Sequence, residues 1–227
     1  ITGSNGKKMV KEWLYQLLSP SMFVTRSPRS YNSQIGVPLS VWLMNEQTQV
    51  GVFEAGISQP GEMLALRDII QPTIAVLTNV GSAHQENFSS LEEKCREKLI
   101  LFHDAETVVY DGDDEVITKV VAEYPDYKGE KLFWSLQNPE APFYVKKIEK
   151  QQSVSVITYI YKGVEDSFSI PFIDDASIQN SIICAAVASK IGLSAEDIDK
   201  RMAQLEPVAM RLEVKVGQHG LSLIHIS

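Results

Sequence analysis

Residues 1–18, ITGSNGKKMVKEWLYQLL, join a glycine-containing loop to a segment with one apolar face. The apolar residues recur at helical spacing and stop before a Ser-Pro pair, which predicts a loop followed by a helix. Loops that lead into a helix N-terminus bind phosphate groups through backbone N–H groups. Gly3, Gly6 and Lys7 fit the phosphate-loop pattern GxxxxGK[ST], in which the lysine reaches the terminal phosphate.

Two positions depart from that pattern. Ile1 stands where the first glycine is expected, and Lys8 stands where a Ser or Thr hydroxyl would bind Mg²⁺. An ammonium group has no lone pair for a metal. Thr and Lys codons can differ by one base, so the sequence leaves open both a genuine lysine and a reading error. The predicted phosphate loop consists of Gly3, Ser4, Asn5, Gly6, Lys7 and Lys8.

Buried runs alternate with helical segments through the first 115 residues. Short β-branched runs predict strands at residues 49–56, 72–80 and 106–114, and amphipathic segments between them predict helices at 59–72 and 89–102. This alternation is typical of an α/β fold with a mostly parallel sheet flanked by helices. We therefore predict a P-loop-type α/β domain.

The segment from about residue 131 to 175 has a different pattern. Residues 153–172 contain two β-rich runs around a glycine turn, which predicts a small antiparallel hairpin region beside the parallel sheet. A helix is then expected to end at Gly192, and Ser194 with Asp197 forms a capping box for the next helix.

Composition restricts the class of protein. The chain has 227 residues, 44% of them hydrophobic, and a net charge of −8, which argues against a nucleic-acid-binding surface. Cys95 and Cys184 lie in apolar surroundings, so we expect reduced core thiols. No apolar run is long enough to span a membrane, and we expect a monomer in the cytoplasm without membrane insertion.

The two ends of the sequence predict a fragment. Few residues precede Gly3, so we expect an incomplete first strand and no turnover by this piece alone. Residues 1–216 are expected to form one domain, and residues 217–227 the truncated start of another. Residues 221–227 resemble the translation of a sequencing adapter, so we expect them to be artefactual.

Three polar residues follow predicted buried strands: Glu54, Asn79 and His84. In an open α/β sheet, ligands bind beyond the carboxyl ends of the strands, where the phosphate loop also lies. A single glutamate there is more often a solvated turn residue, and a single histidine more often a packing residue. Their occurrence together with Lys7 instead indicates a metal–phosphate site.

The order of motifs resembles the central ATPase domain of the Mur ligases of peptidoglycan synthesis, through about residues 1–216. The motifs are GSNGK, YNSQIGVP, FEAGIS, TNVGSAH, SLEEKCREK, IQNSIICAA and MRLE. The resemblance implies an ATP- and Mg²⁺-dependent ligase that joins an amine to a carboxylate through an acyl phosphate. Residues 30–40 are similar to the start of the second strand region in the branch that adds D-Ala-D-Ala to UDP-N-acetylmuramoyl-tripeptide.

The same resemblance implies roles for individual residues. Lys7 would act on the terminal phosphate, and Glu54 and His84 would each hold a Mg²⁺. Lys98 matches a lysine that is carbamylated by CO₂, which turns a cation into an anionic metal ligand. Lys7, His84 and Lys98 are thus the predicted catalytic residues.

Other candidate positions follow from the remaining motifs. Asn180 matches a position near adenine, although Ala176 replaces a histidine usual in relatives; a helix N-cap is an equally good interpretation. Arg211 matches an arginine near the nucleotide phosphates and would otherwise be a surface strand residue. Candidates for contact with the muramoyl peptide are Tyr31, Asn32, Ser33 and Gln34.

Two alternatives remain open from the sequence. One is a Mur ligase that adds a single amino acid, and the other is a degenerate, non-catalytic nucleotide-binding module. Lys8 favours the degenerate module. Glu54, His84 and Lys98 favour an enzyme, because a degenerate module would be expected to have lost them.

Overall fold

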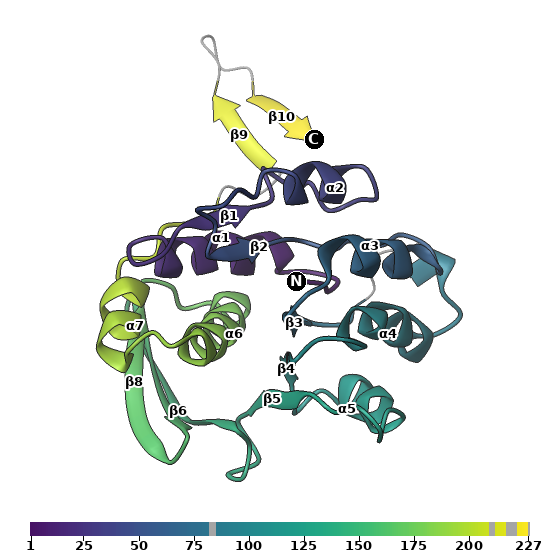
Figure 1. Ribbon diagram of the computed structural model, residues 1–227. Coiled ribbons are helices and arrows are strands. Elements are labelled where there is room, and N and C mark those ends of the chain that lie inside the picture. The colour runs from purple at the N-terminus through teal and green to yellow at the C-terminus, as the bar shows by residue number, and fades with distance from the viewer. Residues whose placement is uncertain (82–84, 209–211, 217–221, 227) are drawn as a thin grey trace.

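The protein is described by a computed structural model that covers residues 1–81, 85–208, 212–216 and 222–226 (Figure 1). A six-stranded sheet has the order β3-β4-β5-β6-β7-β8, and two further pairs are β1-β2 and β9-β10. The strands are β1 (Val24–Arg26), β2 (Val50–Val52), β3 (Ile74–Val76), β4 (Thr107–Asp111), β5 (Glu130–Ser135), β6 (Phe143–Gln151), β7 (Val154–Tyr161), β8 (Val164–Ile170), β9 (Leu212–Val216) and β10 (Ser222–Ile226).

The first two residues connect the β1-β2 pair to the large sheet. Thr2 N donates to Val76 O at 2.7 Å, and Thr78 N donates to Thr2 O at 2.9 Å. On the other side, Ala55 N donates to Ile1 O at 2.7 Å. Residues 1–2 therefore lie between the ends of β2 and β3, and the loop that follows emerges where the strand order reverses. Ligands of doubly wound sheets bind at this position.

Helices cover the two faces of the sheet in separate layers (Figure 1). One layer contains α1 (Lys7–Leu18), α6 (Asp175–Ile191) and α7 (Ala195–Met202). The other contains α2 (Gly36–Val41), α3 (Glu62–Ile70), α4 (Leu91–Leu99) and α5 (Glu115–Ala122), with short 3₁₀ turns at Gln85–Asn87 and Ile100–Phe102. The predicted P-loop-type α/β fold is confirmed.

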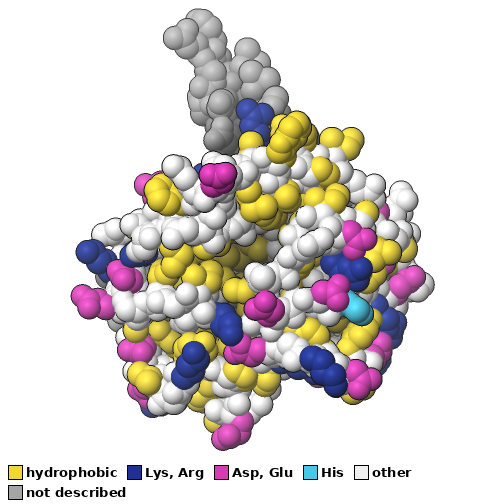
Figure 2. Space-filling view, viewed as in Figure 1, with side chains coloured by type: hydrophobic (Ala, Val, Ile, Leu, Met, Phe, Trp, Pro, Cys, Tyr) yellow, Lys and Arg dark blue, Asp and Glu magenta, His cyan; other side chains and the backbone are white. Residues whose placement is uncertain are grey.

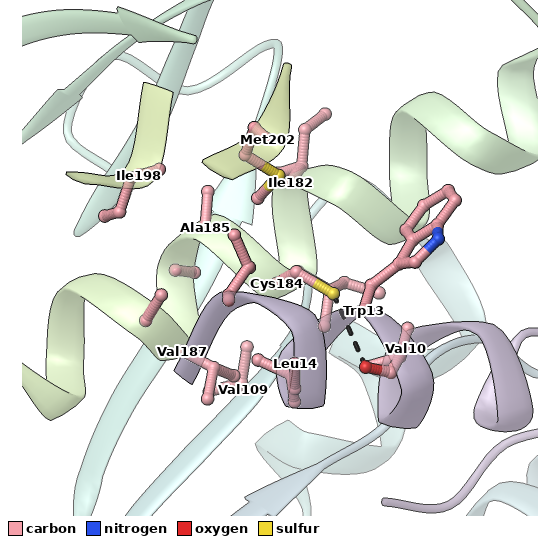
Figure 3. Close-up of a cluster of buried hydrophobic side chains, with 14 of the residues drawn as sticks. Val10, Trp13, Leu14, Val109, Ile182, Cys184, Ala185, Val187, Ile198 and Met202 are labelled. Atoms are coloured by element: carbon pink, nitrogen blue, oxygen red, sulfur yellow. Dashed lines mark hydrogen bonds between the residues drawn. The ribbon is translucent and has the colours of Figure 1, made fainter. Parts of the chain in front are cut away.

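Alternation along the strands produces two hydrophobic cores. Val76 and Val109 face the core under α1 and α6, whereas Ala75 and Val108 face the core under α3 and α4. This is the period of two expected for strands buried on both faces. In the first core, α1 packs on α6, and the Cys184 thiol donates to the carbonyl of Val10 at 3.7 Å (Figure 3).

Several local predictions are confirmed. The loop passes into α1 at Lys7, and α6 ends at Gly192, whose φ of 109° is the left-handed conformation that glycine adopts readily. Asp197 N donates to Ser194 Oγ at 3.1 Å, as the capping box requires. Cys95 and Cys184 are buried free thiols, and burial raises the pKa of Cys95 to about 12.

Two predictions about the sheet need correction. The antiparallel part is not a small region beside the sheet, because β6, β7 and β8 continue the same sheet as its edge. The parallel part also extends farther, since β5 pairs parallel with β4 and β6 pairs parallel with β5. Residues 30–40, expected to begin a strand region, instead form a loop and α2.

Hydrophobic side chains gather on the surface over α2 and the turn after it (Figure 2). Trp42 is 84% exposed and Ile35 is 78% exposed, so no described part of the chain covers this surface.

Within the described residues, no helix combines the length and the apolar character needed to span a bilayer. The last two strands, β9 and β10, pair with each other, and the domain boundary at residue 216 remains a prediction.

Candidate functional site at the phosphate loop

Two glycines allow the loop at residues 3–6 to approach its neighbours closely. Gly3 has a φ of 146° and Gly6 a φ of 80°. A Cβ atom on Gly3 would lie 1.9 Å from Thr78 Oγ1, and one on Gly6 would lie 2.5 Å from Asn180 Oδ1. Any larger residue would therefore meet both backbone strain and a steric clash.

This crowding predicts a difference between two glycines with the same backbone conformation. Gly163→Ala, at a φ of 77° with open space around it, should cost about 1 kcal/mol from strain alone. Gly6→Ala should cost at least about 1 kcal/mol more, because the new methyl group must displace Asn180. Urea denaturation of both variants measures the difference, and equal losses would show that Asn180 yields freely.

The segment after β3 holds the phosphate loop in place. Asn79 Oδ1 accepts from Asn5 N at 2.9 Å, and Ser4 Oγ accepts from Gly81 N at 2.8 Å. Thr78 Oγ1 also donates to the carbonyl of Asn5. Asn79, predicted at a strand end near the site, thus supports the loop.

Positive charge gathers at the start of α1. Lys7 folds over the loop, and its Nζ donates to Gly3 O at 2.7 Å and to Ser4 O at 3.4 Å. Lys8 follows as the second residue of α1 and is partly exposed. The first turn of α1 contains no acidic residue. The positive end of the helix dipole and the positive lysine charges therefore coincide here, which favours the binding of an anion.

The carboxylate of Glu54 is buried and paired with a lysine that sequence reasoning missed. Lys11 Nζ lies 2.9 Å from Glu54 Oε1 and 3.2 Å from Glu12 Oε1, and its side chain is fully buried. The same ammonium donates to Ser27 O at 2.9 Å and to the carbonyl of Arg29. Glu54 is thus close to the predicted position, at the carboxyl end of β2, but its charge is already compensated.

Lys98 lies on α4 and is buried next to other cations. It is 2% exposed, and burial, followed by the nearby charges of Lys7 and Lys94, lowers its pKa to about 7. Lys94 donates to Gly81 O at 2.6 Å, beside the phosphate loop. Lys98 is therefore in an environment that disfavours its protonated form.

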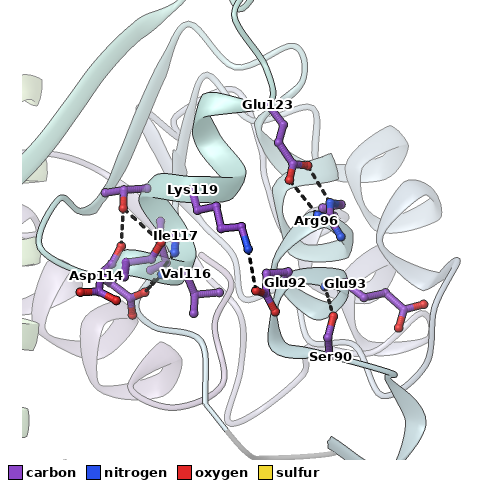
Figure 4. Close-up of polar contacts among 11 residues, drawn as sticks. Ser90, Glu92, Glu93, Arg96, Asp114, Val116, Ile117, Lys119 and Glu123 are labelled. Atoms are coloured by element: carbon purple, nitrogen blue, oxygen red, sulfur yellow. Dashed lines mark hydrogen bonds and ion pairs between the residues drawn. The ribbon is translucent and has the colours of Figure 1, made fainter.

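Contacts with α5 help to fix α4 (Figure 4). Arg96 pairs with Glu123 through two contacts of 2.7 Å, and Lys119 lies 3.1 Å from Glu92. At the helix start, Ser90 Oγ accepts from the backbone nitrogen at position 93, at 3.0 Å. Exposed ion pairs contribute little each, so burial of the opposite face of α4 is the main force that positions Lys98.

Asn180 does not cap a helix. The N-cap of α6 is Asp174, whose Oδ1 accepts from Ser177 N at 2.8 Å, so the capping interpretation of Asn180 is wrong. Asn180 instead lies within α6, 6% exposed, with its Nδ2 3.3 Å from Met9 Sδ and its amide against Gly6. Its described contacts are with the phosphate loop and α1.

The predicted peptide-binding residues lie near the carboxyl end of β2. The Asn32 carbonyl accepts from Gly56 N at 2.7 Å, which places this loop beside the segment that carries Glu54. Tyr31, Ser33 and Gln34 are exposed. The remaining predicted site residues, His84 and Arg211, lie outside the described residues.

Two lysines and a threonine of this site were missed from sequence: Lys11, Lys94 and Thr78. A signal for the lysines existed, because Lys11 follows Lys7 by four residues and Lys94 precedes Lys98 by four. Residues four apart share a helix face, so each pair should point the same way. Thr78 had no comparable signal, since its role depends on a contact between distant segments.

Several known proteins are similar to this chain. The sequence pattern of the Mur ligase middle domain matches residues 1–188. The chain is 28% identical to UDP-N-acetylmuramoyl-tripeptide–D-alanyl-D-alanine ligase of Bacillus subtilis, covering 99% of this chain and 48% of that protein. It is 30% identical to the protein of the same name from Borreliella burgdorferi, covering 90% and 43%. The chain thus spans about half the length of the curated relatives it matches.

Solved structures have the same fold. The MurF ligase of Thermotoga maritima in complex with ADP has a TM-score of 0.80 at 25% identity, covering 99% of this chain and 52% of that one. MurF of Acinetobacter baumannii has a TM-score of 0.83 at 22% identity, covering 100% and 49%.

Proposed function

The chain belongs to the Mur ligase family, and from that premise we propose that residues 1–216 are the nucleotide-binding domain of an ATP-dependent ligase. The proposed reaction joins D-Ala-D-Ala to UDP-N-acetylmuramoyl-tripeptide. We place the enzyme in the cytoplasm as a monomer. The observation that carries the proposal is the cationic phosphate loop, held by Asn79 and Gly81 at the reversal point of the sheet.

In this reaction the terminal carboxylate oxygen of the tripeptide attacks the γ-phosphorus of ATP, and the bond to the ADP oxygen breaks. The amine of D-Ala-D-Ala then attacks the acyl phosphate carbon, loses a proton, and releases inorganic phosphate. Both steps depend on positioning and charge stabilisation more than on covalent help from the protein. We assign Lys7, whose Nζ donates to Gly3 O of the loop, to neutralise the transferred phosphoryl group, and the N–H groups of the loop to orient the remaining phosphates.

Other residues of this domain are proposed to bind the two organic groups. Asn180 and Arg211 are assigned to the nucleotide, and residues 31–34 to the muramoyl peptide. Asn32 lies against Gly56, beside the strand end that carries Glu54. A peptide bound by this loop would reach the edge of the sheet where the phosphate loop begins.

Mg²⁺ is proposed to accompany ATP, and the described residues fit its two implied positions differently. At one position, His84 and Lys98 are the proposed ligands, and Lys98 fits once CO₂ has converted its amine to an anionic carbamate. At the other, Glu54 is the proposed ligand, but it is paired with Lys11 and the neighbouring hydroxyl is replaced by Lys8. This second position does not fit the metal.

Carbamylation of Lys98 has a physical reason in the structure. The neutral amine attacks CO₂ and releases a proton, and the resulting anion would lie near the ammonium groups of Lys7 and Lys94. Because its pKa is lowered to about 7, the amine is mostly neutral by about pH 8 and mostly protonated by about pH 6. At a fixed CO₂ pressure, the carbamate should therefore form at the higher pH and be lost at the lower.

¹³C NMR of the chain under labelled CO₂ measures this reaction. A carbamate signal should be present at about pH 8, absent at about pH 6, and missing from Lys98→Met at both. The same signal in Lys98→Met would place the carbamate elsewhere.

In the full-length enzyme, Lys98→Ala should lose most of the activity, and a short carboxylic acid should restore part of it.

The experiment that tests the proposed function compares amine substrates in the full-length enzyme. Phosphate release from ATP should require UDP-N-acetylmuramoyl-tripeptide together with D-Ala-D-Ala, and single amino acids should not replace the dipeptide. Release with a single amino acid instead would assign the enzyme to another branch of the family. Nucleotide binding without release under any of these conditions would identify a non-catalytic module, the alternative that Lys8 favours.

A further inference from the structure

A Mg²⁺ at a phosphate loop needs hard oxygen ligands, which are normally a hydroxyl at the helix start and nearby carboxylates. This chain has Lys8 in place of the hydroxyl. The carboxylate predicted as a ligand, Glu54, has Oε1 2.9 Å from the buried ammonium of Lys11. In residues 1–81 and 85–208, no three His, Cys, Asp or Glu side chains are grouped to hold a metal. Of the two oxygen ligands expected at this position, the hydroxyl is therefore replaced by Lys8 and the carboxylate is paired with Lys11.

Fixed cations occupy the same region instead. Lys7 Nζ donates a hydrogen bond to Gly3 O in the loop. Lys94 Nζ donates to Gly81 O, and Gly81 N donates to Ser4 Oγ of the loop. Lys8 adds a further positive charge in the first turn of α1, which itself contains no acidic residue. An ammonium attracts a phosphate by the same kind of Coulombic force as a metal ion, although one ammonium carries half the charge of Mg²⁺.

We propose that Lys8 takes the place of the divalent cation at this loop, so that the chain binds the phosphates of a nucleoside diphosphate without Mg²⁺. The proposal rests on the nucleotide site proposed above and changes its cation requirement. Lys11 favours phosphate binding by compensating the negative charge of Glu54 in an ion pair, because an unpaired carboxylate near the loop would repel the phosphates.

Calorimetric titration of the chain with ADP, in EDTA and in excess Mg²⁺, tests the proposal. For the parent chain, the two Kd values should agree within about threefold. Lys8→Thr supplies a hydroxyl and removes the positive charge. This variant should bind ADP more weakly than the parent chain in EDTA, and Mg²⁺ should lower its Kd for ADP at least about tenfold. Lys200→Thr makes the same change at an exposed position of α7 and should behave like the parent chain.

A double variant identifies the acquired metal ligand. Adding Glu54→Gln to Lys8→Thr removes the one carboxylate proposed as a ligand at this position, so it should abolish the gain from Mg²⁺. Parent binding that is at least about tenfold tighter with Mg²⁺ would overturn the inference and leave the proposed function standing. Equal dependence on Mg²⁺ in the parent and Lys8→Thr would also overturn it. Absence of ADP binding under both conditions would overturn the inference and the nucleotide site together.

Discussion

Lys8→Thr in the full-length enzyme should raise Mg²⁺-dependent ATP turnover by at least roughly a hundredfold. The ammonium of Lys8 offers no lone pair to a metal and places a like charge beside it, at the position where a hydroxyl is a Mg²⁺ ligand in phosphate loops. Loss of one such electrostatic contact typically costs about 2.7 kcal/mol in the transition state. Steady-state phosphate release at saturating Mg²⁺ measures the gain.

Two further variants separate the charge from the hydroxyl. Lys8→Ser should reproduce most of the gain, because it restores a ligand oxygen, whereas Lys8→Met removes the charge alone and should recover little. Rates of the parent and Lys8→Thr within a factor of about three would show that the hydroxyl is dispensable. The assignment of the metal position at this loop would then be wrong.

Lys11→Met should destabilise the chain by about 3–5 kcal/mol, because it leaves Glu54 as an unpaired buried carboxylate. The same lysine also holds the carbonyls of Ser27 and Arg29, so α1, the segment after β1 and the end of β2 all lose a contact. Urea denaturation of the chain measures the loss as a lower midpoint with an unchanged slope.

Glu54→Gln provides the matched control for this prediction. Combined with Lys11→Met, it removes the buried charge that the first substitution exposes, so the double variant should recover more than half of the lost stability. A cost below about 1 kcal/mol for Lys11→Met would contradict the account, because that is the value of an exposed ion pair. Failure of the double variant to recover would assign the loss to the backbone carbonyls instead.

Local signals in the sequence were sufficient for the fold class and for the loop that leads into α1. Glycine spacing, the apolar face of residues 9–18 and the capping residues Ser194 and Asp197 act over a few positions, and each element formed as predicted. The extent of the sheet was harder to predict, because β5 and β6 pair with their neighbours at long range. Strand direction in β5 and β6 depends on those neighbours, not on the pattern of either strand.

The positions of the candidate site residues were also predicted only in part, because local signals do not show contacts between distant segments. Lys7 and Glu54 lie at the expected ends of α1 and β2, but nothing local to Glu54 indicates that Lys11 neutralises it. Asn180 was placed near the nucleotide from a motif, whereas its contact with Gly6 depends on the packing of α6 against α1. Positions of side chains along one element were therefore predictable, and contacts between elements were not.

The central claim is that ATP activates a carboxylate as an acyl phosphate. We would label the terminal carboxylate of UDP-N-acetylmuramoyl-tripeptide with ¹⁸O and supply it with ATP and D-Ala-D-Ala to the full-length enzyme. Mass spectrometry of the released phosphate should find one ¹⁸O atom per molecule of amide formed, because the bridging oxygen leaves with phosphorus. Unlabelled phosphate alongside amide formation would contradict the account, since the carboxylate oxygen would then never have been bonded to phosphorus.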